Sequence, residues 1–221
     1  MRMNKTVSAV ALAGALALSL SACGSNDAST GSDTKAAAAS PTPAAQIANL
    51  TGKMTQVTLD PGFVQGLTSL KLTPAPVGTA TIKDGVASFP ITGGNATYYT
   101  PGTVDPYVQG MIKHDGSGLS LTDGKTKVEL TNFVVDPGTS MLTGDVSANG
   151  TSVVKGAPLF FLDGSTLQPL KMEGKDAVLE GTTVSLTKAA ADLLDKTYGT
   201  TALTEFFKVG VAKITLAVPA K

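Results

Sequence analysis

The stretch of sequence that most clearly indicates the fold is Leu119-Ser-Leu-Thr-Asp-Gly-Lys-Thr-Lys-Val-Glu-Leu-Thr131. Apolar and polar residues alternate on both sides of Asp123-Gly124, and a period of two indicates strands with one buried face. An Asp-Gly pair between such runs favours a tight turn, because both residue types tolerate a positive φ. The stretch therefore predicts an antiparallel β-hairpin.

The same combination of strand and turn residues recurs along the chain. Asp84-Gly85 precedes the strand-like run 86–89, and Asp163-Gly164 follows the run 159–162. Asp-Pro-Gly triplets at 60–62 and 136–138 indicate two further turns. Short strands separated by such turns are typical of antiparallel folds. We therefore predict a mainly β fold, either an antiparallel β-sandwich or a partly open barrel.

Helical spacing is confined to short segments, so we expect one to three short helices. Residues 188–196 carry apolar side chains on one face, behind Thr187 as the N-cap. Residues 63–70 are a second candidate. A third runs from 202 to about 209, with Gly210 as its stop.

The N-terminus carries the features of an export signal. Arg2 and Lys5 precede the apolar stretch Val7–Leu20, which at fourteen residues is shorter than the roughly 20 residues of a spanning helix. The stretch ends in Leu20-Ser-Ala-Cys23, which resembles the lipobox of bacterial lipoproteins. The resemblance implies that Cys23 receives a diacylglyceryl group and that residues 1–22 are removed. The alternative is an ordinary signal peptide, cut just before Cys23.

The composition changes after Cys23. Residues 23–46 contain mainly small and polar residues, so we expect a lipidated N-terminus followed by a flexible tether. Residues 47–221 are long enough for a single β-rich domain with a core of its own. We therefore expect the chain to be lipid-anchored at the extracytoplasmic face of the bacterial cell membrane.

Charge and cysteine content exclude several classes of protein. Arg2 is the only arginine, and without residues 1–22 the chain has fifteen lysines and seventeen acidic residues, a formal net charge of −2. A basic patch, which nucleic-acid binding would require, is missing. Cys23 is the only cysteine, so no disulfide within the chain can stabilise the fold.

Few residues are candidates for catalysis or metal binding. His114 is the only histidine, and Asp115 beside it would point to the opposite face of a strand. The sequence has no Gly-x-Ser-x-Gly elbow and no zinc or calcium ligand spacing. Two carboxylates would suffice for a glycosidase, but the chain has no tryptophan for sugar stacking. We therefore predict no enzymatic activity and no metal site, and place His114 near a turn without a special role.

The tyrosines offer an alternative role for His114. Tyr98 lies in the segment 97–100, and Tyr107 stands seven residues before His114. A tyrosine and a histidine that meet in a pocket can ligate haem iron. The simpler interpretation is that these tyrosines are ordinary residues of half-buried strands.

Five segments follow one another along the chain: Val86–Gly94, Ile112–Leu121, Thr131–Asp136, Leu142–Val146 and Phe206–Gly210. Their order resembles that of the secreted haem-transport-associated (HtaA-type) domains of bacterial surface proteins. The resemblance implies a β-rich module that binds haem through tyrosine assisted by histidine, with His114 matching the family histidine. Phe206-Phe207 and Phe63 stand where that family has aromatic segments containing tyrosine, so a haem site here would use Tyr107 or Tyr98 instead.

Three functions remain open from the sequence. The first is a membrane-anchored extracytoplasmic lipoprotein whose β-domain has a non-enzymatic binding or structural role. The alternative is a haem-binding surface lipoprotein that uses His114, Tyr107 and Tyr98, and the third is a tethered hydrolase. The expected partners are membrane lipid through Cys23 and a small ligand or a surface protein, without nucleic acid.

Overall fold

The structure, a computed structural model, describes residues 40–218. The predicted signal peptide, the predicted lipidation site at Cys23 and most of the predicted tether lie outside these residues. The first strand begins at Ala45, two residues before the predicted start of the β-domain. This strand pairs with Gly93–Tyr98 (β6), so residues 45–47 belong to the sheet of the β-domain.

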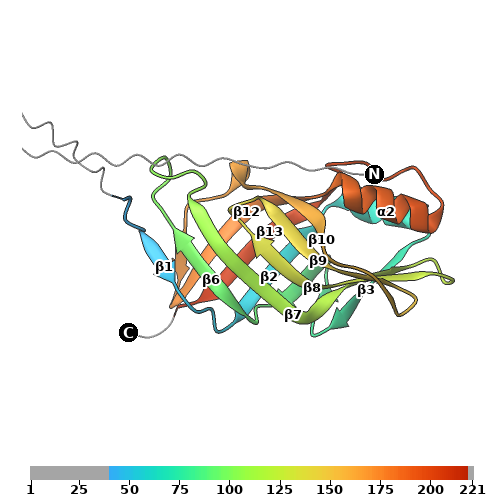
Figure 1. Ribbon diagram of the computed structural model, residues 1–221, viewed down its shortest axis with the longest axis horizontal. Helices are drawn as coiled ribbons and strands as arrows, with labels where there is room; N and C mark the ends of the chain where they lie inside the picture. The colour runs from blue at the N-terminus through green and yellow to red at the C-terminus, as the bar shows by residue number, and fades with distance from the viewer. Residues whose placement is uncertain (1–39, 219–221) are drawn as a thin grey trace, which may run out of the picture. The chain divides into compact units, whose positions relative to one another are not determined.

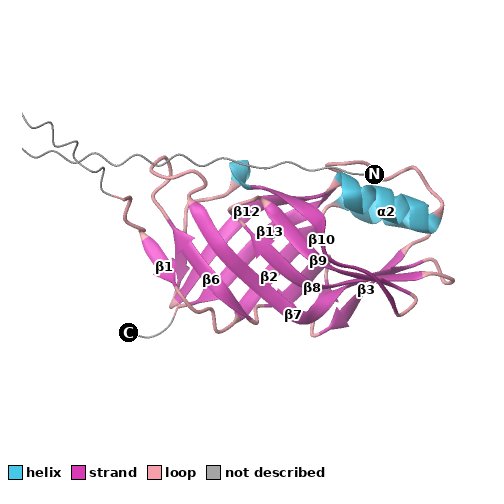
Figure 2. Ribbon diagram, viewed as in Figure 1, coloured by secondary structure: helices cyan, strands magenta, loops and turns pink. Residues whose placement is uncertain are grey.

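The described part of the chain is mainly β, as predicted, with two α-helices and one short 3-10 helix (Figure 2). The helices are α1 (Pro61–Ser69), α2 (Lys188–Tyr198) and the 3-10 helix η1 (Gly164–Thr166). The strands are β1 (Ala45–Ile47), β2 (Lys53–Leu59), β3 (Thr73–Gly78), β4 (Thr81–Lys83), β5 (Val86–Pro90), β6 (Gly93–Tyr98), β7 (Val108–Thr122), β8 (Lys127–Asp136), β9 (Met141–Ala148), β10 (Thr151–Asp163), β11 (Lys171–Glu173), β12 (Asp176–Leu186) and β13 (Lys208–Ala217).

All thirteen strands belong to one antiparallel sheet, in the order β1-β6-β7-β8-β9-β10-β12-β13-β2-β5-β4, with β3 on β7 and β11 on β12. The sheet curls around one interior, and α2 lies at one end of it (Figure 1). The curl brings β5 against β7, where the rings of Phe89 and His114 meet edge to face. Of the two architectures predicted from the sequence, the partly open barrel is therefore the one observed.

The hairpin predicted from residues 119–131 is formed by β7 and β8. Leu119 pairs with Leu130, and Leu121 pairs with Val128. The Asp123 carboxylate accepts hydrogen bonds from the backbone N–H groups of Lys125 and Thr126, which fixes the turn. Just before this stretch in β7, position 118 requires glycine, because a Cβ there would lie 2.0 Å from the Leu130 carbonyl oxygen.

Of the four other predicted turns, two are found as turns and two begin helices, one of them Asp163-Gly164, where Asp163 caps η1. Asp84 and Gly85 both have positive φ and form the two-residue turn between β4 and β5, as expected. Residues 137–140 connect β8 to β9. The triplet at 60–62 instead begins α1, because Asp60 caps the helix by accepting from Gly62 N and Pro61 occupies its first turn.

Two of the three predicted helices are confirmed, as α1 and α2, and Thr187 is the N-cap of α2 as expected. The helix predicted over 202–209 is wrong. Phe206 has a φ of 60°, outside the helical region. Its N–H donates to Leu186 O at the end of β12, and Leu186 N–H donates to Phe207 O. Backbone pairing with β12 satisfies these groups, and the chain continues directly into β13.

The core lies inside the curl, where the inward side chains of the strands meet. Its centre is a series of aromatic rings packed edge to face, in which Phe133 contacts Phe89 at 5.3 Å and Phe160 at 6.2 Å between ring centroids. Within residues 40–218 there is no helix long and apolar enough to cross a membrane.

Candidate functional site

The curled sheet encloses a cavity of about 410 Å³. This volume is within the range of about 300–1,000 Å³ that is usual for small-molecule sites. Its walls are the inner face of the sheet, with β7 and β8 on one side and β2, β12 and β13 on the other. Most of the lining is aliphatic or aromatic, including Ile112, Leu142 and Val184.

The cavity opens between loops at one edge of the sheet. Its solvent-exposed lining includes Asp105 in the loop 99–107 and Gly164 and Ser165 in η1. Figure 1 shows the loop between β6 and β7 at the same edge as η1. Pro137 and Ser140, from the connection between β8 and β9, complete the rim. The strands therefore form the body of the cavity and three loops form its opening.

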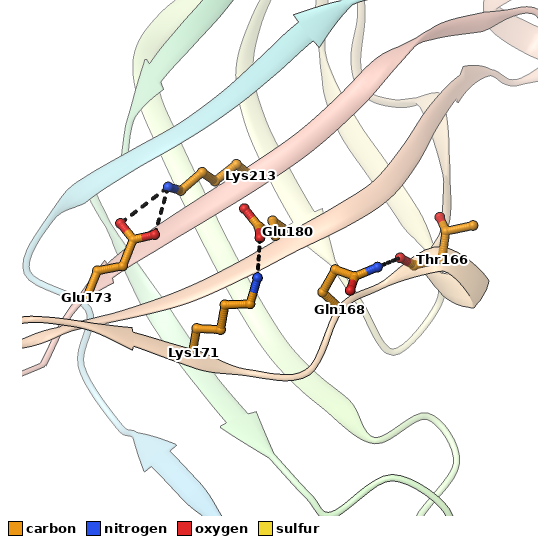
Figure 3. Close-up of polar contacts among 6 residues, drawn as sticks. All are labelled: Thr166, Gln168, Lys171, Glu173, Glu180 and Lys213. Atoms are coloured by element: carbon orange, nitrogen blue, oxygen red, sulfur yellow. Dashed lines mark hydrogen bonds and ion pairs between the residues drawn. The ribbon is translucent and has the colours of Figure 1, made fainter.

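The η1 side of the opening is fixed to β12. The Thr166 hydroxyl donates to Gly181 O at 2.6 Å, and the Gln168 N–H donates to Glu180 O at 2.8 Å. On the outer surface beside it, Lys171 pairs with Glu180 at 2.6 Å, and Lys213 pairs with Glu173 at 3.0 Å (Figure 3). These ion pairs are solvent-exposed and contribute little to stability, so the backbone contacts hold the segment.

Tyr107 and Tyr98 lie together beside the opening. Their ring centroids are 5.8 Å apart with perpendicular planes, and Leu170 N donates to the Tyr98 hydroxyl at 3.5 Å. Tyr107 lines the cavity, whereas Tyr98 contacts Tyr107 and is not part of the cavity lining. Burial, with a smaller contribution from Tyr98, raises the pKa of Tyr107, so its phenol is protonated at neutral pH.

His114 lies inside the sheet and not near a turn, which corrects the sequence-based placement. It is in the middle of β7 and only 1% exposed. Its Nε2 lies 2.8 Å from the Thr55 hydroxyl on β2, and its Nδ1 lies 3.3 Å from the Phe133 carbonyl on β8. Because β2 and β7 are not neighbours in the sheet, the Thr55–His114 hydrogen bond joins two distant parts of the curl.

The partners of His114 define its tautomer and charge. A carbonyl oxygen only accepts, so Nδ1 carries the proton and donates to Phe133, while the Thr55 hydroxyl donates to Nε2. Burial lowers the pKa of His114 to about 4, against smaller opposing effects of the Phe133 hydrogen bond and Asp115. The imidazole is therefore neutral at physiological pH, and both ring nitrogens have partners.

The structure brings Tyr98 and Tyr107 together but separates both from His114. Val108, next to Tyr107, and His114 are six positions apart along β7, a distance of roughly 20 Å at ~3.3 Å per residue. Tyr107 and His114 line the same cavity at different places.

The described residues do not fit haem held by a tyrosine–histidine pair. A ligating Nε2 would have to give up Thr55, and no tyrosine lies beside it in the contacts made by residues 40–218. Phe63, in α1, packs against Phe207 at 6.3 Å and supplies no phenol. The same part of the chain contains no cluster of three or more histidine, cysteine or carboxylate residues that could hold a metal ion.

Thr55 and His114 also have the spacing of a nucleophile and its general base. Their environment argues against that role, because both side chains are at least 95% buried and the pKa of His114 makes it a weak base. A backbone carbonyl, and not a carboxylate, faces Nδ1. We interpret the pair as a structural link across the curl.

Thr55 was not recognised from the sequence as a partner of His114. It lies 59 residues away, in a strand whose inward positions alternate with outward ones. Alternation could have placed Thr55 on the inner face, but no local pattern indicates which strand lies opposite. The cavity likewise depends on the order of strands in the sheet.

Comparisons with known proteins support the fold. No family model matches the chain, and a search of curated proteins returned no match. Among solved structures, the chain is similar to the C-terminal domain of HtaA from Corynebacterium glutamicum, with a TM-score of 0.52 and 14% sequence identity. The similarity covers 76% of this chain and 97% of that domain. The chain therefore has an HtaA-like fold, as the resemblance of the sequence motifs implied.

Proposed function

We propose that this chain is a lipoprotein, held at the extracytoplasmic face of a bacterial membrane through Cys23, whose β-domain binds a small ligand without catalysis. The observation that carries the binding role is the 410 Å³ apolar cavity, open at one end, inside the curled sheet. A cavity of this size in the interior of a domain leaves its lining side chains without packing partners, which bound apolar ligand would supply.

Haem is the second candidate ligand, suggested by the resemblance of the sequence motifs to haem-transport-associated domains and by the tyrosine at the opening of the cavity. We place it second because His114 and the tyrosines do not meet. A saturable Soret shift that is lost in Tyr107→Phe, in a chain that stays folded by far-ultraviolet circular dichroism, would favour haem over the ligand class proposed below.

Binding is tested with the neutral fluorescent probe N-phenyl-1-naphthylamine and the mature chain carrying Cys23→Ala, so that no acyl chain or detergent competes. We expect saturable fluorescence enhancement. In Ala212→Leu, where the added methyl groups enter the cavity, we expect roughly tenfold weaker binding. The matched control is Val211→Leu, because Val211 precedes Ala212 on β13 and faces outward.

Two results would contradict the binding role. One is the absence of saturable binding by a chain whose far-ultraviolet circular dichroism shows the folded β structure. The other is equal binding by Ala212→Leu and Val211→Leu, which would show that the probe occupies another place.

The anchor is tested by replacing its cysteine. We expect Cys23→Ala to abolish incorporation of labelled palmitate and to release the chain from stable membrane retention, because one thiol carries the lipid. Ser25→Ala, two residues further on, is the matched control and should be labelled like the parent chain. Unchanged labelling of Cys23→Ala would show that the lipobox interpretation is wrong.

A further inference from the structure

The charged residues around the cavity are all acidic. Asp105 and Asp163 line it at the open end, and none of the lysines of residues 40–218 contributes to its lining. The only arginine of the chain, Arg2, lies outside the described residues. A ligand with a negative group would therefore meet two carboxylates and no cation at the opening.

The polar groups inside the cavity are largely occupied by the protein itself. Thr55 and His114 satisfy each other, and the Gln109 amide donates to Pro106 O at 3.1 Å. The Asp163 carboxylate accepts from Ser165 N at 2.9 Å as the cap of η1. The interior thus presents hydrocarbon together with polar atoms that already have partners.

An anionic ligand is disfavoured both inside the cavity and at its opening. Buried among the apolar side chains, its charge would lose water without gaining a counter-ion. Left at the opening, its charge would be repelled by Asp105 and Asp163. An uncharged apolar ligand meets neither obstacle, and its transfer from water is favourable.

We infer that the cavity selects an uncharged, largely hydrocarbon molecule and rejects anionic molecules of similar size and shape. This inference rests on the proposed binding function and adds the chemical class of the ligand. Haem, whose porphyrin carries two carboxylates, is an anionic molecule and is therefore disfavoured on this ground as well.

Two probes with the same aromatic skeleton test the inference. N-phenyl-1-naphthylamine is neutral, and 8-anilinonaphthalene-1-sulfonate adds one sulfonate to the same anilinonaphthalene framework. Binding of the sulfonate is measured by its competition with the neutral probe for the site that Ala212→Leu impairs. At low ionic strength we expect the sulfonate to bind the mature Cys23→Ala chain at least about tenfold more weakly than the neutral probe does.

The charge at the opening is then reversed. Asp105→Lys should strengthen binding of the sulfonate about fivefold relative to binding of the neutral probe, because Asp105 is exposed and lines the opening. The matched control, Asp192→Lys, makes the same change in net charge on the exposed face of α2, away from the cavity lining. It should affect neither probe.

The outcomes separate this inference from the proposed function. Equal binding of both probes at the Ala212 site would overturn the selection of uncharged ligands while leaving the binding function intact. Equal effects of Asp105→Lys and Asp192→Lys would also overturn it, since the discrimination would then come from net charge. Failure of both probes to bind contradicts the binding function itself.

Discussion

His114→Ala is expected to lower the free energy of unfolding by about 3 kcal/mol. The substitution removes a fully buried side chain, leaves a void beside Phe89, and deprives the Thr55 hydroxyl and the Phe133 carbonyl of a partner. A loss of about 1–3 kcal/mol is typical for one buried polar group left without its hydrogen bond, and the void adds to it. Urea unfolding followed by far-ultraviolet circular dichroism measures the change.

Two further variants identify the origin of this loss. Thr55→Val keeps the volume of the side chain and removes the hydroxyl, so it should cost about 1–2 kcal/mol. In the double variant the two effects should be less than additive, because the shared hydrogen bond is lost only once. Lys113→Ala, at the exposed position before His114, is the control and should be close to neutral. A loss below 1 kcal/mol in His114→Ala would contradict the structural link across the curl.

The second large effect is a dependence of stability on pH between about 6.5 and 4. In the folded chain burial lowers the pKa of His114 to about 4, whereas the unfolded chain has the ordinary value near 6.5. Above pH 6.5 both states are neutral and the full stability is present. As the pH falls through this window the unfolded state binds a proton first, so stability decreases by up to about 3 kcal/mol and then levels off.

The measurement is the free energy of unfolding across this pH range in the parent chain and in His114→Ala. The difference between the two curves isolates His114 from the carboxylates, several of which have lowered pKa values and titrate at lower pH. Asp115, the neighbouring charge, opposes the effect of burial and is present in both chains. Parallel curves would show that His114 is not neutral and buried in the folded state.

Much of the fold follows from local sequence. The Asp123-Gly124 and Asp84-Gly85 turns, the helix behind Thr187 and the predominance of strands are all determined within a few residues, and each is found in the structure. The segment around Phe206 was mispredicted because its backbone pairs with β12, which is distant in sequence from the local helical pattern. Asp60-Pro61-Gly62 contains residues that suit both turns and helix starts, and the apolar run after it favours the helix.

The candidate site is less predictable, because it depends on which strands face each other. His114 was singled out as the only histidine, but its partners come from β2 and β8 and its charge state depends on their contacts. The sequence suggested that Tyr107 meets His114 in a pocket; Tyr107 lines the cavity, but the length of β7 separates it from His114. The cavity itself requires the curl of the whole sheet, which alternation within single strands does not specify.

The most direct test of a ligand cavity inside the sheet is to locate the neutral probe. Methyl-selective carbon–proton spectra of the mature Cys23→Ala chain, recorded while N-phenyl-1-naphthylamine is added, report each valine and leucine separately. We predict that the largest changes occur at the lining residues Val135, Leu142 and Val184, with little change at the exposed Val64 and Val153. Changes concentrated at Val64 and Val153, with the lining methyl groups unaffected, would contradict the account.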